Sequence, residues 1–153
     1  MIYKIDQSGK VEDIGRDTVL AICNGKSFTV KISSKTKIGI RKMFGKSGRG
    51  NIYVYRVFSI LIFLLIRSCG FVVNEVIIDE EYTGQEKTLI NMLSQLFTQN
   101  RSKRPEIYFA RIGNKPTVHY AAYNVYKRKK KADMVINLKQ ILNLTTKKDR
   151  GLK

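Results

Sequence analysis

The chain opens with three short segments whose apolar positions are typical of β-strands. Met1 to Asp6 is predicted as a short strand, Thr18 to Cys23 is rich in β-branched residues, and Ser27 to Ile32 alternates apolar and polar residues with a period of two. Asn24-Gly25 stands between the second and third segments, and this dipeptide favours a tight hairpin turn because both residues tolerate a left-handed backbone. The pattern therefore predicts an antiparallel meander of three strands.

The rest of the chain alternates between helical and strand patterns. The longest apolar run, Val57 to Ile66, lies inside a predicted helix over Asn51 to Ser68. Ten residues are too few to cross a bilayer as a helix, which takes about 20, so a buried core helix is expected. Thr83 and Glu86 have the spacing of a capping box and predict a helix start. The other predicted elements are a helix at Lys37 to Phe44, a flexible loop at Gly45 to Gly50, strands at Phe71 to Asp79, Glu106 to Ile112 and Met134 to Ile136, and helices at Lys115 to Tyr126 and Leu138 to Leu144.

This order of elements predicts an α/β fold. Three antiparallel strands followed by alternating helices and strands give a mixed sheet with helices on both faces. A length of 153 residues suits one domain over 1–153, with a short strand-helix appendage at about 132–146 and a basic C-terminal end.

The net charge of the chain indicates which kinds of molecule it is expected to bind. Lys and Arg number 29 against 12 Asp and Glu, which gives a formal net charge of +17. Nucleic acid, either DNA or RNA, is the expected partner of such a chain, with an anionic membrane surface or a plain lysine-rich soluble protein as alternatives. No membrane segment or signal peptide is predicted, and Cys23 and Cys69 are interpreted as buried thiols in a reducing compartment, so a cytoplasmic location is expected.

Acidic residues gather in one place despite this charge. Five of the twelve lie between Glu75 and Glu86, at the end of the apolar strand that finishes with Asp79 and Glu80. Clustered carboxylates repel one another unless a cation or basic side chains lie among them. A basic protein with a compact acidic cluster has the features of a metal-dependent enzyme that acts on a polyanion.

Two basic segments are predicted to bind the phosphates of a nucleic acid without recognising its base sequence. The first is Lys35 to Arg49 and the second is Lys127 to Lys131. Gly45-Lys46-Ser47 matches the end of a phosphate-binding loop, but Ile40 stands where that loop needs glycine, so no such loop is predicted. Tyr120, Tyr123 and Tyr126 recur every three residues ahead of the second basic segment, either as a core stripe or, if exposed, as a platform for unpaired bases. The predicted nucleic-acid-binding residues are Arg41, Lys42, Lys46, Arg49, Lys127, Arg128, Lys129, Lys130 and Lys131.

The order of elements resembles that of the ribonuclease H-like superfamily of nucleases, resolvases and transposases over about the first 126 residues. In that fold the first and fourth strands are parallel neighbours, each ending in a metal-binding aspartate. Asp6, in Lys4-Ile5-Asp6-Gln7-Ser8-Gly9, and Asp79 hold those places here. His119, in Thr117-Val118-His119-Tyr120-Ala121-Ala122, falls on the helix where the family has a further ligand.

The resemblance implies a nuclease that hydrolyses phosphodiester bonds with Mg²⁺ or Mn²⁺. Asp6 and Asp79 would bridge two ions, Glu80 would complete the ligand shell, and His119 would bind metal or shuttle protons. The family's glutamate on the helix after the third strand has no counterpart, since Asn51 to Ser68 contains no acidic residue. Glu80, Glu81 or Glu86 substitutes for it, or the site is incomplete.

Plainer interpretations stay open. Asp6 would equally suit the opening of a turn, and His119 a helix surface or a hydrogen-bonded core position. An incomplete site predicts a non-catalytic nucleic-acid-binding protein on the same fold, and charge alone would suit an assembly protein with an acidic partner. A homodimer, which a resolvase would need, is compatible with the chain, although no feature marks a dimer surface.

Overall fold

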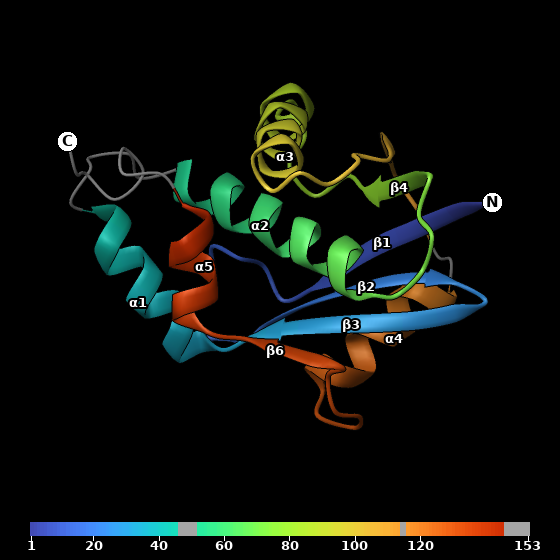
Figure 1. The fold of residues 1–153 in the computed structure, drawn as a ribbon. Helices are drawn as coiled ribbons and strands as arrows, with labels where there is room; N and C mark the ends of the chain where they lie inside the picture. The colour runs from blue at the N-terminus through green and yellow to red at the C-terminus, as the bar shows by residue number, and fades with distance from the viewer. Residues whose placement is uncertain (46–51, 114–115, 146–153) are drawn as a thin grey trace.

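The computed structural model describes residues 1–45, 52–113 and 116–145. In these residues one mixed sheet has the strand order β5-β4-β1-β2-β3-β6 (Figure 1). The strands are β1 (Ile2–Ser8), β2 (Thr18–Asn24), β3 (Lys26–Ile32), β4 (Glu75–Asp79), β5 (Glu106–Ala110) and β6 (Met134–Ile136). The helices are α1 (Ser34–Gly45), α2 (Ile52–Ser68), α3 (Glu86–Gln99), α4 (Pro116–Tyr126) and α5 (Leu138–Leu144). The α/β class is therefore confirmed.

The predicted meander is present. β1 pairs antiparallel with β2, and β2 pairs antiparallel with β3 through a hairpin at Gly25, whose φ is 77°. β1 continues to Ser8, two residues past the predicted end at Asp6, because Ser8 still has a partner in Val19 of β2. Asp6 therefore lies inside a strand and does not open the turn.

Parallel pairing joins the meander to the rest of the sheet. β4 lies parallel to β1, β5 parallel to β4, and β6 parallel to β3. The predicted strand start at Phe71 is wrong, since β4 begins at Glu75. Glu75 is where β4 first meets both neighbours, at Ile2 and Glu106, so the residues before it have no ladder to join. β5 likewise ends at Ala110, opposite the last residue of β4, and not at Ile112.

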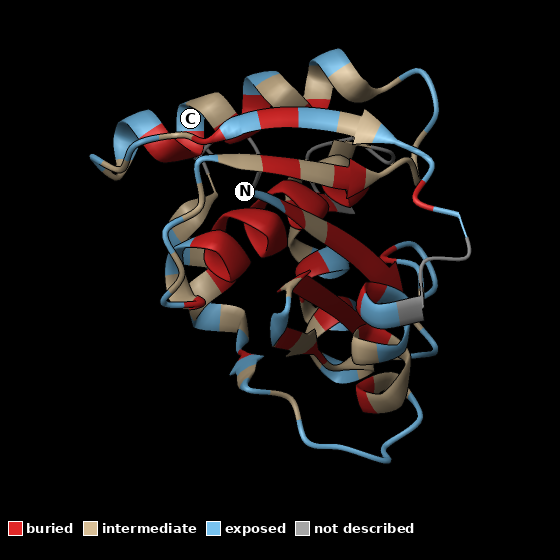
Figure 2. Ribbon diagram, turned by 90° about the vertical axis from the view of Figure 1, so that its right-hand side faces the viewer, coloured by how far each residue is buried: buried red, intermediate tan, exposed pale blue. Residues whose placement is uncertain are grey.

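Helices cover both faces of the sheet, as predicted. The larger core lies between one face of the sheet and α2, with side chains from α1, α3 and α5 added to it. α2 is buried around most of its circumference, in agreement with its apolar sequence, and Figure 2 shows this concentration of buried residues. α4 alone covers the opposite face, where Val118, Ala122 and Val125 pack on Val19 and Ala21 of β2.

Two helix starts differ from the prediction. α1 begins at Ser34, three residues before the predicted Lys37, because the Ser33 hydroxyl accepts a hydrogen bond from the Thr36 N–H and caps the first turn. The predicted capping box of Thr83 and Glu86 is wrong. Gly84 has a φ of 83°, which is incompatible with a helix, so α3 begins only at Glu86. The predicted loop at Gly45 to Gly50 falls almost wholly outside the described residues.

A buried lysine holds the loop between β1 and β2 in place. Lys37 is 1% exposed, and its Nζ donates hydrogen bonds to the carbonyls of Lys10 and Asp13 and to the Thr18 hydroxyl, at 3.1, 2.6 and 2.9 Å. Burial lowers the pKa of Lys37 to about 8. These bonds fasten the loop to α1 and so fix the direction in which the chain leaves β1.

None of the helices in the described parts of the chain is both long enough and apolar enough to span a membrane.

We expect Gly9→Ala to destabilise the fold much more than Gly25→Ala. Both glycines have φ near 77°, so both substitutions carry the cost of about 1 kcal/mol for an L-residue in that region. A Cβ at Gly9 would also lie 2.2 Å from the Asp17 carbonyl oxygen and 2.7 Å from the Tyr126 ring, whereas a Cβ at Gly25 meets nothing within 4 Å. Overpacking should add about 2 kcal/mol or more at Gly9 alone, as urea unfolding would measure. Equal losses would show that the turn at Gly9 is not packed as described.

Candidate metal centre

The register of two parallel strands brings the candidate acidic residues together. Ile5 of β1 is the neighbour of Ile78 of β4, so the next residues, Asp6 and Asp79, lie side by side just past the end of the parallel ladder. Asp6 is opposite Ala21 of β2, which belongs to the core under α4, so its side chain is on the α4 face of the sheet. The predicted juxtaposition of Asp6 and Asp79 is present.

Three carboxylates form the cluster. Oxygens of Asp6, Asp79 and Glu81 all lie within 4.8 Å of one another. Asp6 is buried, while Asp79 and Glu81 are half-buried. The spacing fits side chains that share one cation, and carboxylate oxygens are ligands that Mg²⁺ and Mn²⁺ prefer. The donor set thus fits a hard divalent cation, although it does not identify which one.

Hydrogen bonds orient two of these carboxylates. The Ile112 N–H donates to Asp79 Oδ1 at 2.8 Å, so the segment after β5 holds this side chain. The Gln7 N–H donates to Asp6 Oδ1 at 2.8 Å. Each aspartate therefore has one oxygen engaged by backbone and keeps its other oxygen for a further partner.

His119 reaches the centre from α4. Its Nδ1 lies 3.2 Å from Asp6 Oδ2, and its side chain is 49% exposed. The imidazole thus contacts the buried aspartate on one side and solvent on the other. This position fits a group that exchanges protons between the site and water.

The cluster is electrostatically strained when no cation is bound. Burial raises the pKa of Asp6, and the charge of Asp79 adds to this effect, although hydrogen bonds from Gln7 and His119 oppose it. Burial, followed by the charges of Asp79 and Asp6, raises the pKa of Glu81 to about 7. A divalent cation would reverse this strain, since it favours the charged form of every carboxylate that it touches.

Glu80, the predicted third ligand, is not in this group of three. A side-chain hydrogen bond with Glu86 raises the pKa of Glu80, and both residues are half-buried. The chain stays extended past Asp79, since the Glu80 N–H still donates to the Ala110 carbonyl. Alternate residues of an extended chain share a side, so Glu81 joins Asp79 and Glu80 points elsewhere. That period of two was the signal in the sequence that favoured Glu81 over Glu80.

Tyr82 anchors the segment that carries Glu81. Its hydroxyl donates to Glu12 Oε1 at 3.1 Å, and its ring packs edge-on against Tyr55 and Phe58 of α2. Burial is the main cause that raises the pKa of Tyr82 far above its usual value, so the hydroxyl stays protonated and remains a donor. Sequence reasoning did not identify this contact, because Glu12 and Tyr82 lie 70 residues apart.

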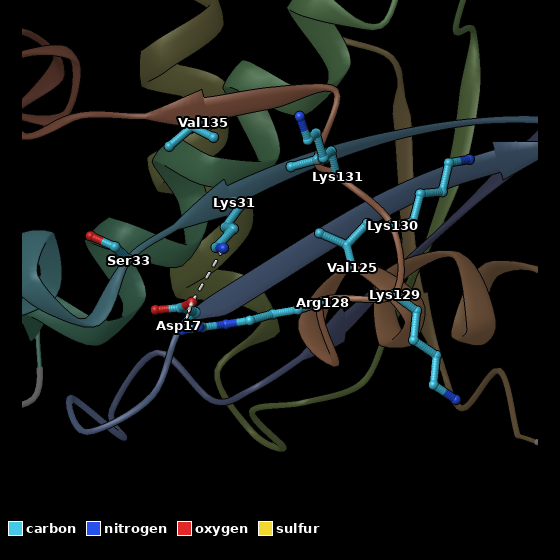
Figure 3. Close-up of a pocket in the computed structure, with 10 residues that line it drawn as sticks. Asp17, Lys31, Ser33, Val125, Arg128, Lys129, Lys130, Lys131 and Val135 are labelled. Carbon is cyan, nitrogen blue, oxygen red and sulfur yellow. Dashed lines mark ion pairs between the residues drawn. The ribbon is translucent and has the colours of Figure 1, made fainter.

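The predicted basic residues fall into separate groups. Arg41 and Lys42 are exposed on α1, which packs with α2 and α5 on the face opposite α4. Lys46 and Arg49 lie outside the described residues. Lys127 to Lys131 directly follow α4, on the side of the sheet that carries the three carboxylates. Four residues of that second group, Arg128 to Lys131, line an open groove of about 790 Å³ together with Lys31 (Figure 3).

Comparisons with protein-family models, with curated proteins and with solved structures found no match to this chain. The geometry of the site and the physical properties of the chain are therefore the basis for a function.

We expect Glu81→Gln to stabilise the metal-free protein at about pH 8 but not at about pH 4. The folded-state pKa of about 7 lies above the ordinary value of 4.5, so the folded protein binds more protons than the unfolded chain between these pH values. The free energy of unfolding should thus fall as pH rises through this window, and the neutral amide should avoid the loss, a gain of about 1–2 kcal/mol once solvent screening is allowed for. Urea unfolding in EDTA at the two pH values measures it.

Glu75→Gln is the matched control, because it removes the same charge from the other end of β4, outside the group of three. Little change is expected for this variant at either pH. An equal gain for Glu81→Gln at both pH values would contradict the electrostatic origin of the strain.

Proposed function

We propose that this protein is a divalent-metal-dependent nuclease that hydrolyses nucleic-acid phosphodiester bonds on a ribonuclease H-like fold. The observation that carries the proposal is the convergence of Asp6, Asp79 and Glu81 oxygens within 4.8 Å at the ends of two parallel strands. Three acidic side chains close together are unfavourable by themselves, and a cation with a phosphate substrate gives the arrangement a purpose.

The topology supports the fold assignment. The sheet order β5-β4-β1-β2-β3-β6 places the two aspartate-bearing strands next to each other, as the resemblance to ribonuclease H-like enzymes implies. α4 follows β5 and brings His119 to Asp6, which is where the resemblance expects a further functional group. Glu81 would replace the glutamate that those enzymes carry on the helix after the third strand.

The charge of the chain supports the substrate class. A net charge of +17 attracts polyanions in general, and Lys127 to Lys131 concentrate part of that charge at the end of the helix that carries His119. A phosphodiester strand held by these cations would meet the three carboxylates on the same side of the sheet.

Different residues would have different roles in the hydrolysis. Asp6, Asp79 and Glu81 would hold Mg²⁺ or Mn²⁺, which when bound lowers the pKa of water and offsets negative charge on the scissile phosphate. Ile112 and Gln7 would keep the two aspartates oriented through their N–H groups. His119, with one nitrogen toward Asp6 and one side toward solvent, would carry a proton to or from the reacting oxygens.

We expect the protein to cleave labelled DNA or RNA in Mn²⁺ or Mg²⁺ and to lose this activity in EDTA. Asp79→Asn keeps the hydrogen-bond acceptor for Ile112 but removes the charge that a cation needs, so cleavage should fall by at least about 100-fold. A gel assay with single-stranded, duplex and branched DNA and with RNA measures the loss and identifies the substrate.

Glu75→Gln is the matched control, since it removes one carboxylate from the opposite end of the same strand and should cleave like the wild-type protein. Binding without cleavage, unchanged in Asp79→Asn and indifferent to EDTA, would refute the nuclease. That result would favour a non-catalytic nucleic-acid-binding protein. The absence of an acidic residue from α2 is consistent with this alternative.

A further inference from the structure

α4 carries an exposed stripe of rings that begins beside the candidate metal centre. His119 and Tyr123 lie one turn apart, and their rings are stacked with centroids 5.8 Å apart and an interplanar angle of 15°. Lys127, a further turn along, has its Nζ 5.7 Å from the Tyr123 ring centroid. Residues at this spacing share one face of a helix. The stripe therefore runs without a break from Asp6 to the basic segment after α4.

The tyrosines of α4 do not all have the same environment. Tyr120 is 53% exposed beside the His119 ring, at 5.4 Å between centroids. Tyr126 instead packs on Gly9, and its hydroxyl accepts a hydrogen bond from Arg16 at 3.3 Å. The core-stripe interpretation thus fits Tyr126, while Tyr120 presents a large ring to solvent that the fold does not need for its core.

The stripe leads into the basic groove. Lys31 and Arg128 reach Asp17 from two sides, at 3.4 and 3.8 Å, and Figure 3 shows both side chains directed at it. Asp17 is further satisfied by the Ser34 N–H at 2.9 Å. Lys129, Lys130 and Lys131 have no carboxylate partner among the residues that the structure describes. The groove therefore presents an excess of positive charge over its single acidic residue.

The backbone at Arg128 allows a substitution that removes its charge from the groove at no conformational cost. Arg128 has a φ of 61° at the end of α4, where its N–H bonds to the Val125 carbonyl and the Lys129 N–H bonds to the Asn124 carbonyl. This is the Schellman arrangement, whose left-handed position favours glycine. An arginine at this position costs conformational free energy, and its guanidinium lies in the groove.

We propose that the α4 surface is a binding track for an unpaired nucleic-acid strand. Bases would stack on the exposed ring of Tyr120, and the phosphates would enter the groove of Lys31, Arg128 and Lys129 to Lys131. Rings that are presented to solvent can stack on a base only when its face is free, so single-stranded segments are favoured over a continuous duplex. This proposal depends on the proposed function in one respect, namely that the bound strand would also reach the carboxylates of Asp6, Asp79 and Glu81.

The test is fluorescence anisotropy with a labelled 20-nucleotide oligothymidine and with the duplex that it forms with oligoadenosine. All measurements are made in EDTA, so that binding is measured without cleavage. The wild-type protein should bind the single strand more tightly than the duplex. Arg128→Gly should weaken single-strand binding at least threefold and lower the slope of log affinity against log salt by about 0.7, the value for one lost phosphate contact.

Arg101→Gly is a matched control for charge and backbone. Arg101 has a φ of 55° in the same arrangement at the end of α3, with N–H groups of Arg101 and Ser102 bonded to Thr98 and Phe97 carbonyls. α3 packs on α2, on the opposite side of the sheet from α4 (Figure 1). Both glycine variants should unfold at the same temperature as the wild-type protein or higher, and only Arg128→Gly should lose affinity. Equal effects of the two variants on binding would overturn the groove as the phosphate site.

Tyr120→Ala tests the stacking. It should weaken single-strand binding at least fivefold and leave duplex binding nearly unchanged. Tyr120→Phe, which keeps the exposed ring and removes only its hydroxyl, should change neither. Equal affinity for single strand and duplex, with no effect of Tyr120→Ala, would overturn the preference for unpaired strands. Because EDTA is present throughout, these outcomes are independent of whether the protein cleaves nucleic acid.

Discussion

The parallel pairing of β1 with β4 is the interaction on which the rest of this structure depends. β1 and β4 are separated by the meander and two helices, and two parallel strands can pair only through a long crossover. α2 lies in that crossover and is almost wholly apolar, so burying it against the sheet supplies the hydrophobic free energy that holds the two halves of the chain together. The same pairing sets the register that places Asp6 beside Asp79.

The candidate metal centre lowers the stability that this pairing provides. Asp6 and Asp79 lie just past the end of the parallel ladder, beside established hydrophobic packing, and Glu81 is added by the extended segment after β4. Burial and mutual repulsion raise the pKa of both Asp6 and Glu81, so the arrangement is less stable than an uncharged one. Tyr82 anchors that segment to α2 and to Glu12, and the N–H of Ile112 holds Asp79, so the fold keeps the carboxylates together despite their repulsion. Such a conflict between local electrostatics and overall fold is characteristic of functional sites.

The two faces of the sheet have different structural roles. α1, α2, α3 and α5 build the main core on one side, whereas the single helix α4 covers the other. Because α4 packs through Val118, Ala122 and Val125, its remaining faces are free to carry His119 toward the carboxylates and Tyr120 toward solvent. The acidic centre, the exposed rings and the basic groove thus share one side of a sheet that is stabilised mainly from the other.

Much of the fold followed from the sequence, because local patterns carry it. Short apolar, β-branched and alternating segments predicted β1 to β3, the Asn24-Gly25 turn predicted the hairpin, and the apolar run predicted α2. Strand ends at Glu75 and Ala110 did not follow, since a strand stops where its neighbours stop, and that depends on residues far away in the chain. The sequence also identified Asp6, Asp79 and His119 as candidates by their places in the order of elements. Only the tertiary structure decided that Glu81 joins them, that Lys37 fastens the loop after β1, and that Tyr120 is exposed while Tyr126 is packed. These outcomes depend on long-range contacts. The period of two puts Glu81 on the side of Asp79 only because the bond from the Glu80 N–H to the Ala110 carbonyl keeps the chain extended, and that bond joins residues far apart in the sequence.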